Sequence, residues 1–291
     1  MIGIREFNKK IVSLKNTKKM TKTMKMVAAS KFKRAYKAQA GALSYARELA
    51  DLMNRLAATQ SEISHPLFEQ PKNIQNALVL LVTSEKGLCG GFNNNLIRYV
   101  RAWSNANKEK YKFIDFSFCG RRGFTALRRQ VSVNKNYEDV TYKPSFANAV
   151  KIADDLVKDF LDRKYDEIYL AYNHFKNPLS QVPLLEKLIP FDAQMFRKQH
   201  MKGAFGDYIF EPQSSELFKF LVPKYLNFKI YFSLLENAAG EHGSRMTAMD
   251  KATENTSELI DQYVMSRNRA RQAAITTELI EIVSGAEALN N

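Results

Sequence analysis

Apolar residues recur through the first sixty residues at alternating steps of three and four. Twelve of the sixteen positions of this frame are apolar. The frame consists of Ile4, Phe7, Ile11, Leu14, Lys18, Thr21, Lys25, Ala28, Phe32, Ala35, Gln39, Ala42, Ala46, Leu49, Met53 and Leu56. A mean step of 3.5 residues keeps one stripe of a helix turned toward a partner helix, so the pattern predicts a coiled-coil helix.

Polar residues interrupt the frame at one place. Lys18, Thr21 and Lys25 occupy consecutive frame positions, while Met20, Met24 and Val27 form a second, shifted apolar face. Methionine side chains are flexible and fill irregular surfaces. Two interpretations stay open here: the methionines pack in a core, or they contact another protein.

A second long helix is predicted for Ser244 to Ser284. These 41 residues lie between Gly243 and Gly285 and contain no Gly or Pro. At about 1.5 Å per residue the helix would span roughly 60 Å, so most of it needs a partner outside its own globular part. The expected stripe is Met246, Met249, Thr256, Leu259, Ile260, Tyr263, Ala270, Ala273, Ala274 and Thr277.

The simplest partner for each long helix is the other one, in an antiparallel coiled coil. The helical pattern resumes from Gln213 and is expected to kink at Pro223, so the second helix begins about thirty residues before Ser244. The expected division is an N-terminal helix at 1–60, an α/β domain at 74–210 and a C-terminal helix at 211–287.

Between the helices, short β-rich runs alternate with helical ones. Strands are expected at Ala77–Thr83, Lys112–Cys119, Glu167–Asn173, Gln181–Ile189 and Asp207–Phe210, and helices at Phe92–Trp103, Arg121–Arg129 and Phe146–Arg163. This alternation is typical of a mostly parallel sheet with helices on its faces. The predicted fold class is therefore α/β, with a Rossmann-like domain inserted into a long antiparallel coiled coil.

The net charge is +14, and its distribution is uneven. From Phe7 to Arg47 there are twelve Lys or Arg and no Asp or Glu. Such a segment is either a solvated helix face or a surface for an acidic partner, and nucleic acid, phospholipid and protein all qualify. A basic coiled-coil protein that binds nucleic acid is therefore the alternative function, although no separate basic region precedes the heptads.

The sequence offers weak candidates for chemistry. The turn Gly87-Leu-Cys-Gly-Gly91 follows a strand and precedes a helix, as phosphate-binding turns do, but it matches neither a dinucleotide nor a Walker A motif. A nucleotide-dependent enzyme is the rival interpretation, and a structural turn is favoured. Two cysteines and four scattered histidines give no metal-ligand spacing. We expect no catalytic residue, no cofactor and no metal site.

Three blocks carry a family resemblance. They are SLKNTKKMTKTMKMVAASK at residues 13–31, TSEKGLCGGFN at residues 83–93, and SRMTAMD with NRARQAAITTELIEIVSGA at residues 244–250 and 268–286. Together they resemble the γ subunit of the F-type ATP synthase, over the whole chain. The resemblance implies a rotor: one copy of a coiled coil inside a hexamer of α and β subunits, reaching the c ring of the membrane sector and the ε subunit.

The resemblance also implies contact residues. Met24, Lys25, Arg245, Arg271, Gln272 and Thr276 would contact the α and β subunits, and Tyr208, Phe210 and Glu211 would contact the c ring and ε. The redox insertion of the chloroplast type is missing from this sequence, so thiol regulation is not expected.

The location follows from the same comparison with the family. The sequence has no run of 18 apolar residues and no signal-peptide pattern. We therefore expect a bacterial, non-catalytic subunit on the cytoplasmic face of the inner membrane. It would be bound to the membrane only through its complex and would not bind nucleic acid.

Overall fold

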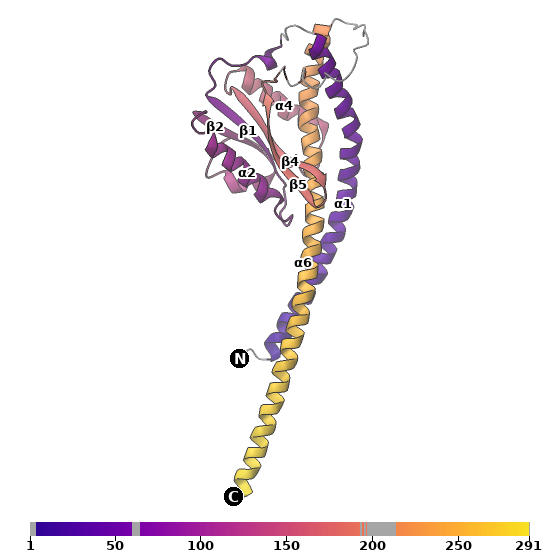
Figure 1. Ribbon diagram of the computed structural model, residues 1–291, viewed down its shortest axis with the longest axis vertical. Coiled ribbons are helices and arrows are strands. Elements are labelled where there is room, and N and C mark those ends of the chain that lie inside the picture. The colour runs from indigo at the N-terminus through magenta and orange to yellow at the C-terminus, as the bar shows by residue number, and fades with distance from the viewer. Residues whose placement is uncertain (1–3, 60–64, 193, 195, 197–213, 291) are drawn as a thin grey trace. The chain divides into compact units, whose positions relative to one another are not determined.

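The computed structural model describes residues 4–59, 65–192, 194, 196 and 214–290 (Figure 1). Contacts divide the chain into two units, which are described separately. The helical unit comprises residues 1–28 and 246–291, and the α/β unit comprises residues 29–245. Two long helices, α1 (Ile4–Thr59) and α6 (Ser214–Asn290), each contribute to both units.

The α/β unit is built on a five-stranded sheet with the order β3-β2-β1-β4-β5. Its strands are β1 (Asn76–Val82), β2 (Phe113–Cys119), β3 (Ser132–Tyr137), β4 (Glu167–Asn177) and β5 (Ser180–Ile189). Strands β1 to β4 pair in parallel, and β5 pairs antiparallel with β4. The predicted mostly parallel sheet is confirmed, although β3 was not expected. The expected strand at Asp207–Phe210 lies outside the described residues.

Alternate side chains of β1 build two separate cores on the two faces of the sheet. Leu78 and Leu80 belong to a core that includes helix α4 (Phe146–Leu161) and parts of both long helices. Val79 and Leu81 point the other way, into a core with helix α2 (Phe92–Ala106). The short helix α3 (Arg121–Leu127) closes this second core, and the short 3-10 helix η1 (Pro66–Phe68) lies at the edge of the first. Every residue from Ala77 to Val82 is fully buried, as an apolar strand covered on both faces requires.

In the α/β unit, α1 and α6 pack together against the sheet. Met53 and Leu56 of α1 lie in the same buried cluster as Val222 and Leu226 of α6. Helix α6 is described from Ser214, and its helical conformation continues through Pro223. The predicted start at Gln213 lies outside the described residues.

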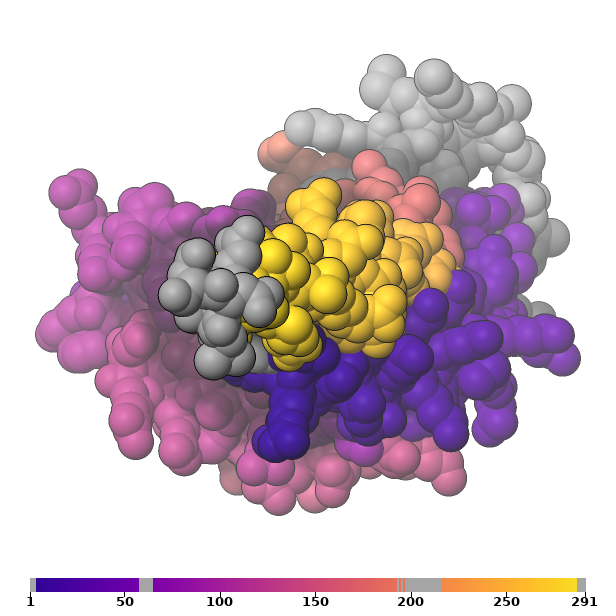
Figure 2. Space-filling view, turned by 90° about the horizontal axis from the view of Figure 1, so that it is seen from below, coloured from indigo at the N-terminus to yellow at the C-terminus, as the bar shows by residue number. Residues whose placement is uncertain are grey.

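In the helical unit, α1 and α6 run antiparallel, as predicted. The hydroxyl of Thr253 donates to that of Thr21 at 2.8 Å, and the rings of Phe7 and Tyr263 lie 6.2 Å apart. Figure 2 shows the indigo start of α1 against the yellow part of α6. All sixteen frame positions of α1 are buried or partly buried, the three consecutive polar ones included. The frame is therefore correct along its whole length.

The predicted stripe of α6 is correct only in its first part. Met249 and Thr256 are buried, but Leu259 is 41% exposed. Every residue from 271 to 286 is exposed, so Ala273, Ala274 and Thr277 face no helix within the part of the chain that the structure describes. The reason is length, because the contact of Arg267 with Asn8 already lies near the start of α1. Beyond it, α6 continues as a single helix.

Candidate functional site

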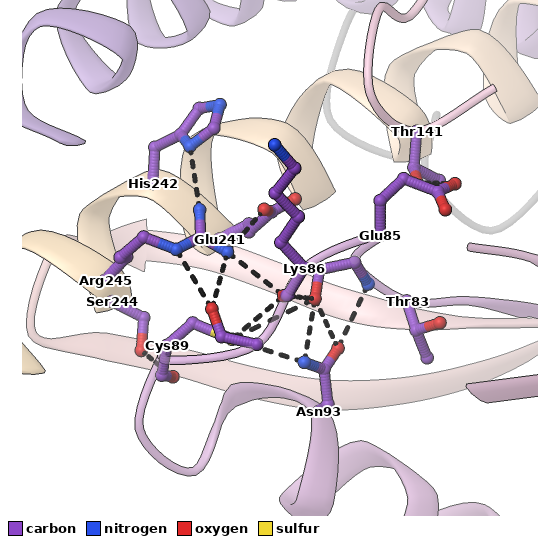
Figure 3. A network of polar contacts seen from close by, with 12 residues as sticks. Thr83, Glu85, Lys86, Cys89, Asn93, Thr141, Glu241, His242, Ser244 and Arg245 are labelled. Carbon is purple, nitrogen blue, oxygen red and sulfur yellow. Dashed lines mark hydrogen bonds and ion pairs between the residues drawn. The ribbon is translucent and has the colours of Figure 1, made fainter. Parts of the chain in front are cut away.

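The loop that follows β1 is folded onto itself by one asparagine. We call residues 83–93 the clasp loop. Asn93 Oδ1 accepts from the backbone N–H of Ser84 at 3.0 Å, and Asn93 Nδ2 lies 2.8 Å from Ser84 Oγ and 3.2 Å from Cys89 Sγ (Figure 3). Leu88 and Gly90 take positive φ angles of 61° and 56°, which turn the chain back between β1 and α2. The loop thus presents its carbonyl groups on one side.

Helix α6 of the same unit binds those carbonyl groups. Arg245 donates from Nε and Nη2 to Gly87 O at 3.1 and 3.0 Å, and from Nη2 to Lys86 O at 3.0 Å. Ser244 Oγ donates to Cys89 O at 2.7 Å (Figure 3). Asn237 Nδ2 reaches Thr83 O at 3.2 Å, where β1 ends. We call these contacts between α6 and the clasp loop the helix–loop clasp.

The close approach of α6 to α2 requires a glycine. A Cβ atom at Gly240 would lie only 2.8 Å from Cε2 of Phe92, the first residue of α2. The place that a phosphate would take beside a glycine-rich turn at the start of a helix is therefore filled by α6. This packing favours the structural interpretation of the turn Gly87–Gly91, which stays a prediction.

Buried charges strengthen the clasp. Arg245 Nη2 lies 2.7 Å from Glu241 Oε1, and the two side chains are 11% and 7% exposed. Burial raises the pKa of Glu241, and the nearby Arg245 guanidinium opposes that shift. Burial, together with the charges of Arg245 and Lys31, lowers the pKa of His242 to about 4. His242 is therefore neutral at pH 7, and its Nδ1 can accept from Arg245 Nη1 at 3.2 Å.

Met24 and Lys25 of the predicted site lie on α1 in the helical unit. Lys25 Nζ contacts Asp250 Oδ1 of α6 at 2.5 Å, with both side chains about 40% exposed. Met24 is partly buried and lines a shallow groove of about 330 Å³ with Met20 and Lys19. Met20 and Val27 are 64% and 52% exposed. The shifted apolar face therefore points away from α6, which leaves these side chains available to another protein.

None of the other predicted contact residues that the structure describes lines this groove. Arg271, Gln272 and Thr276 are exposed on the single-helix part of α6, and Thr276 Oγ1 donates to the carbonyl of Gln272 at 3.0 Å. Arg245, by contrast, uses its guanidinium within the clasp. Tyr208, Phe210 and Glu211 lie outside the described residues.

The single-helix part of α6 carries large apolar side chains that nothing in the described chain covers. Their exposed fractions range from 48% to 67%. They are Ile275, Leu279, Ile280, Ile282 and Val283. Contiguous exposed apolar surface of this kind marks an interaction site. Sequence reasoning predicted small residues here and missed these larger ones, although their spacing of three and four was visible.

The described residues contain no cluster of three or more His, Cys, Asp or Glu side chains that could hold a metal ion. Within the same ranges, no helix has the length and apolar character that crossing a membrane requires.

Comparison with known proteins identifies the family. The family model described as ATP synthase matches residues 3–289. The ATP synthase gamma chain of Geobacter metallireducens is 40% identical over 289 residues, covering 99% of both chains. This chain belongs to the ATP synthase gamma-chain family. The gamma chain of Christiangramia forsetii is likewise 40% identical, over the full length of both proteins.

Solved structures agree with this gamma-chain assignment. A chain of the Tetrahymena thermophila mitochondrial ATP synthase central stalk and c-ring has a TM-score of 0.56 and 26% identity, covering 80% of this chain and 99% of that one. A chain of the Euglena gracilis mitochondrial ATP synthase reaches a TM-score of 0.66 over 98% of this chain and 94% of that one. At 19% identity the second likeness concerns the fold alone. None of these gamma-chain comparisons supports the nucleic-acid alternative.

Removing Arg245 should destabilise the α/β unit more than removing the whole ion pair. Arg245→Met leaves the buried Glu241 carboxylate without its partner, which costs about 3 to 5 kcal/mol for pairs of this kind. The double variant Arg245→Met, Glu241→Leu leaves no buried charge without a partner. Its free energy of unfolding should therefore fall less than that of Arg245→Met. Urea unfolding monitored by circular dichroism measures both. Equal losses in the two variants would mean that the ion pair does not stabilise the clasp.

The neutral state of His242 should make stability depend on pH. Its folded pKa of about 4 lies below the ordinary value of 6.5. The stability that results is complete above pH 6.5 and is lost as the pH falls toward 4, because the unfolded chain takes up the proton first. His242→Gln keeps an acceptor for Arg245 but cannot titrate, so its melting temperature should fall less than that of the wild type between pH 7.5 and 4. Glu241 titrates in both proteins, so any difference between them reports on His242. If the melting temperatures of the two proteins fell equally with pH, His242 would not be the cause of the pH dependence.

Proposed function

We propose that this chain is the central-stalk rotor of an F1Fo ATP synthase, which couples proton-driven rotation of the c ring to ATP synthesis in a hexamer of α and β subunits. One observation carries the proposal: in a chain of gamma-chain length, α6 continues beyond the start of α1 as an exposed single helix with uncovered apolar side chains. An end of this kind needs a socket made by other chains. The uncovered side chains would be buried there on assembly.

The geometry suits the transmission of torque. One charge that crosses the membrane yields roughly 2.3 kcal/mol per 100 mV, so the work of several charges must pass through the stalk for each ATP. Helix α6 runs without a break from residue 214 to residue 290, and within the α/β unit the helix–loop clasp joins the end of β1 and the loop after it to residues 237–245 of this helix. Force applied to the sheet would thus reach α6 through a buried, hydrogen-bonded joint rather than through a flexible linker.

The proposed contacts with the hexamer lie at two levels. Met24 and Lys25 would meet an acidic loop of β, and the basic segment Phe7–Arg47 would draw that loop in without a fixed socket. Arg271, Gln272 and Thr276 would contact the surrounding α and β subunits. Arg245 would contribute only through the small exposed part of its side chain.

The foot and the setting of the complex complete the proposal. Tyr208, Phe210 and Glu211 would contact the c ring and ε. We assign residues 1–60 and 211–287 to the shaft and 74–210 to the inserted domain, with one copy of the chain in each complex. The subunit would itself be non-catalytic and peripheral, on the cytoplasmic face of a bacterial inner membrane.

Reconstitution tests the function directly. The isolated chain should hydrolyse no ATP, but membranes that contain α, β, ε and the membrane sector should synthesise ATP from a proton gradient only when the chain is added. At low ionic strength it should purify from membranes with two larger partners. Recovery of the chain alone or with nucleic acid, or coupled synthesis without it, would refute the rotor role.

Met24→Lys tests the contact of the groove with a moving partner. An added cation beside the acidic loop strengthens an ion pair by about 0.3 to 1 kcal/mol if it is exposed, and by more if partly desolvated, which raises the barrier to leaving one rotary position. The variant should assemble and hydrolyse ATP but pump protons at least threefold less per ATP. The matched control is Met26→Lys, because Met26 is 58% exposed and does not line the groove.

ATPase rate and proton pumping are measured on the same membranes for both variants. A proportional loss of both activities in Met24→Lys, with less subunit on the membrane, would show that Met24 is simply a packing residue. Equal uncoupling by both variants would remove the special role of the groove.

A further inference from the structure

A second feature of the α/β unit has no part in the stalk function proposed above. A cavity of about 450 Å³ lies where β1, β2 and β3 end, between α3 and the loop after β3. Its volume falls within the range of small-molecule sites, roughly 300 to 1,000 Å³. In open α/β sheets, ligands bind outside the carboxyl ends of the parallel strands. The cavity therefore has both the size and the place of a ligand site.

Hydrogen bonds hold Glu85, one of the residues that line this cavity, in place. Glu85 Oε2 accepts from the backbone N–H of Arg121 at 3.1 Å, and Glu85 Oε1 accepts from Thr141 Oγ1 at 2.9 Å. Gly120, with a φ of 101°, allows β2 to turn into α3, because a Cβ atom there would lie 2.2 Å from Thr83 O. The wall built on α3 is thus fixed relative to the end of β1, and the cavity exists without a ligand.

One wall is cationic. Arg121, the first residue of α3, and Arg128, which directly follows its last residue, both line the cavity. Neither guanidinium has an ion-pair partner among the described residues. The Arg128 guanidinium lies 5.6 Å from the centroid of the Phe124 ring, which also lines the cavity. Paired guanidiniums are suited to a phosphate group, and a flat guanidinium or aromatic surface is suited to a base.

The opposite wall is acidic and limits what can enter. Glu85, Glu138 and Asp139 line the cavity, so its three carboxylates outnumber its two guanidiniums. Carboxylates accept hydrogen bonds from ribose hydroxyls, but they repel a polyphosphate. The acidic wall therefore disfavours a long phosphate chain.

We propose that this cavity binds a nucleoside monophosphate. Its phosphate would lie between Arg121 and Arg128, its base against Phe124 and Arg128, and its ribose hydroxyls against the carboxylates. Glu85 directly precedes Lys86, whose carbonyl Arg245 binds, so an occupied cavity adjoins the helix–loop clasp. The inference does not depend on the rotor role.

Calorimetric titration of the full-length chain with adenosine monophosphate, adenosine, inorganic phosphate and ATP tests the proposal. We expect the monophosphate to bind at least tenfold more tightly than each of the other three. Arg121→Gln and Arg128→Gln should each weaken its binding at least tenfold. Arg129→Gln is the matched control, because Arg129 is also exposed beside the end of α3 but does not line the cavity, and it should change binding less than twofold.

Several outcomes would overturn the proposal. Equal binding of phosphate and the monophosphate would show a simple anion site, and tighter binding of ATP would contradict the role of the carboxylates. Equal weakening by Arg129→Gln would show that general surface charge attracts the ligand. Thermal unfolding of each variant without ligand verifies that it is folded. The monophosphate should raise the melting temperature of the wild type and of Arg129→Gln, but not that of Arg121→Gln or Arg128→Gln.

Discussion

The hydrogen bonds from α6 to the carbonyls of the clasp loop hold the sheet of the α/β unit against this helix. A glycine-rich turn after a buried strand has carbonyl groups that must be satisfied, and here Ser244 and Arg245 satisfy three of them. The same contacts fill the space beside this turn. They also attach the end of β1 and the loop after it to residues 237–245 of α6.

Packing in the helical unit differs from that of a tight zipper. The polar frame positions of α1 turn toward α6, where Thr21 meets Thr253 and Lys25 meets Asp250. The exposed ion pair contributes little stability, on the order of 0 to 1 kcal/mol, so it sets register more than it adds strength. The methionines beside it remain outside, partly or largely exposed. An interface of this kind can hold two helices together and still leave its outer face free for other chains.

The sequence predicted what depends on repeated apolar positions. The frame of α1, the buried strand β1 and the second helix follow from periodicity, and all are present. Strand β3 was missed because only Tyr137 at its end packs in the core, while Asn134 bonds to Ser117 and Asp159. No apolar alternation could reveal it.

The candidate sites were less accessible to prediction. The partner of Lys25 is Asp250, 225 residues away, and the ligands of Arg245 are backbone carbonyls, which leave no trace in residue type. The cavity behind α3 likewise needs three strand ends to be brought together. Local patterns cannot report such distant pairings, whereas the resemblance of whole blocks identified the family correctly.

The uncovered apolar end of α6 has a consequence for the life of the chain before assembly. A newly made copy presents Leu279, Ile280, Ile282 and Val283 to solvent, each more than half exposed. An exposed apolar surface of this kind favours self-association and binds chaperones and proteases when no partner subunit is present. A cell would therefore gain by making this chain in step with its partners, because any surplus is a liability for aggregation. The same exposed residues that would be buried in the assembled complex therefore make an unassembled chain a target for degradation.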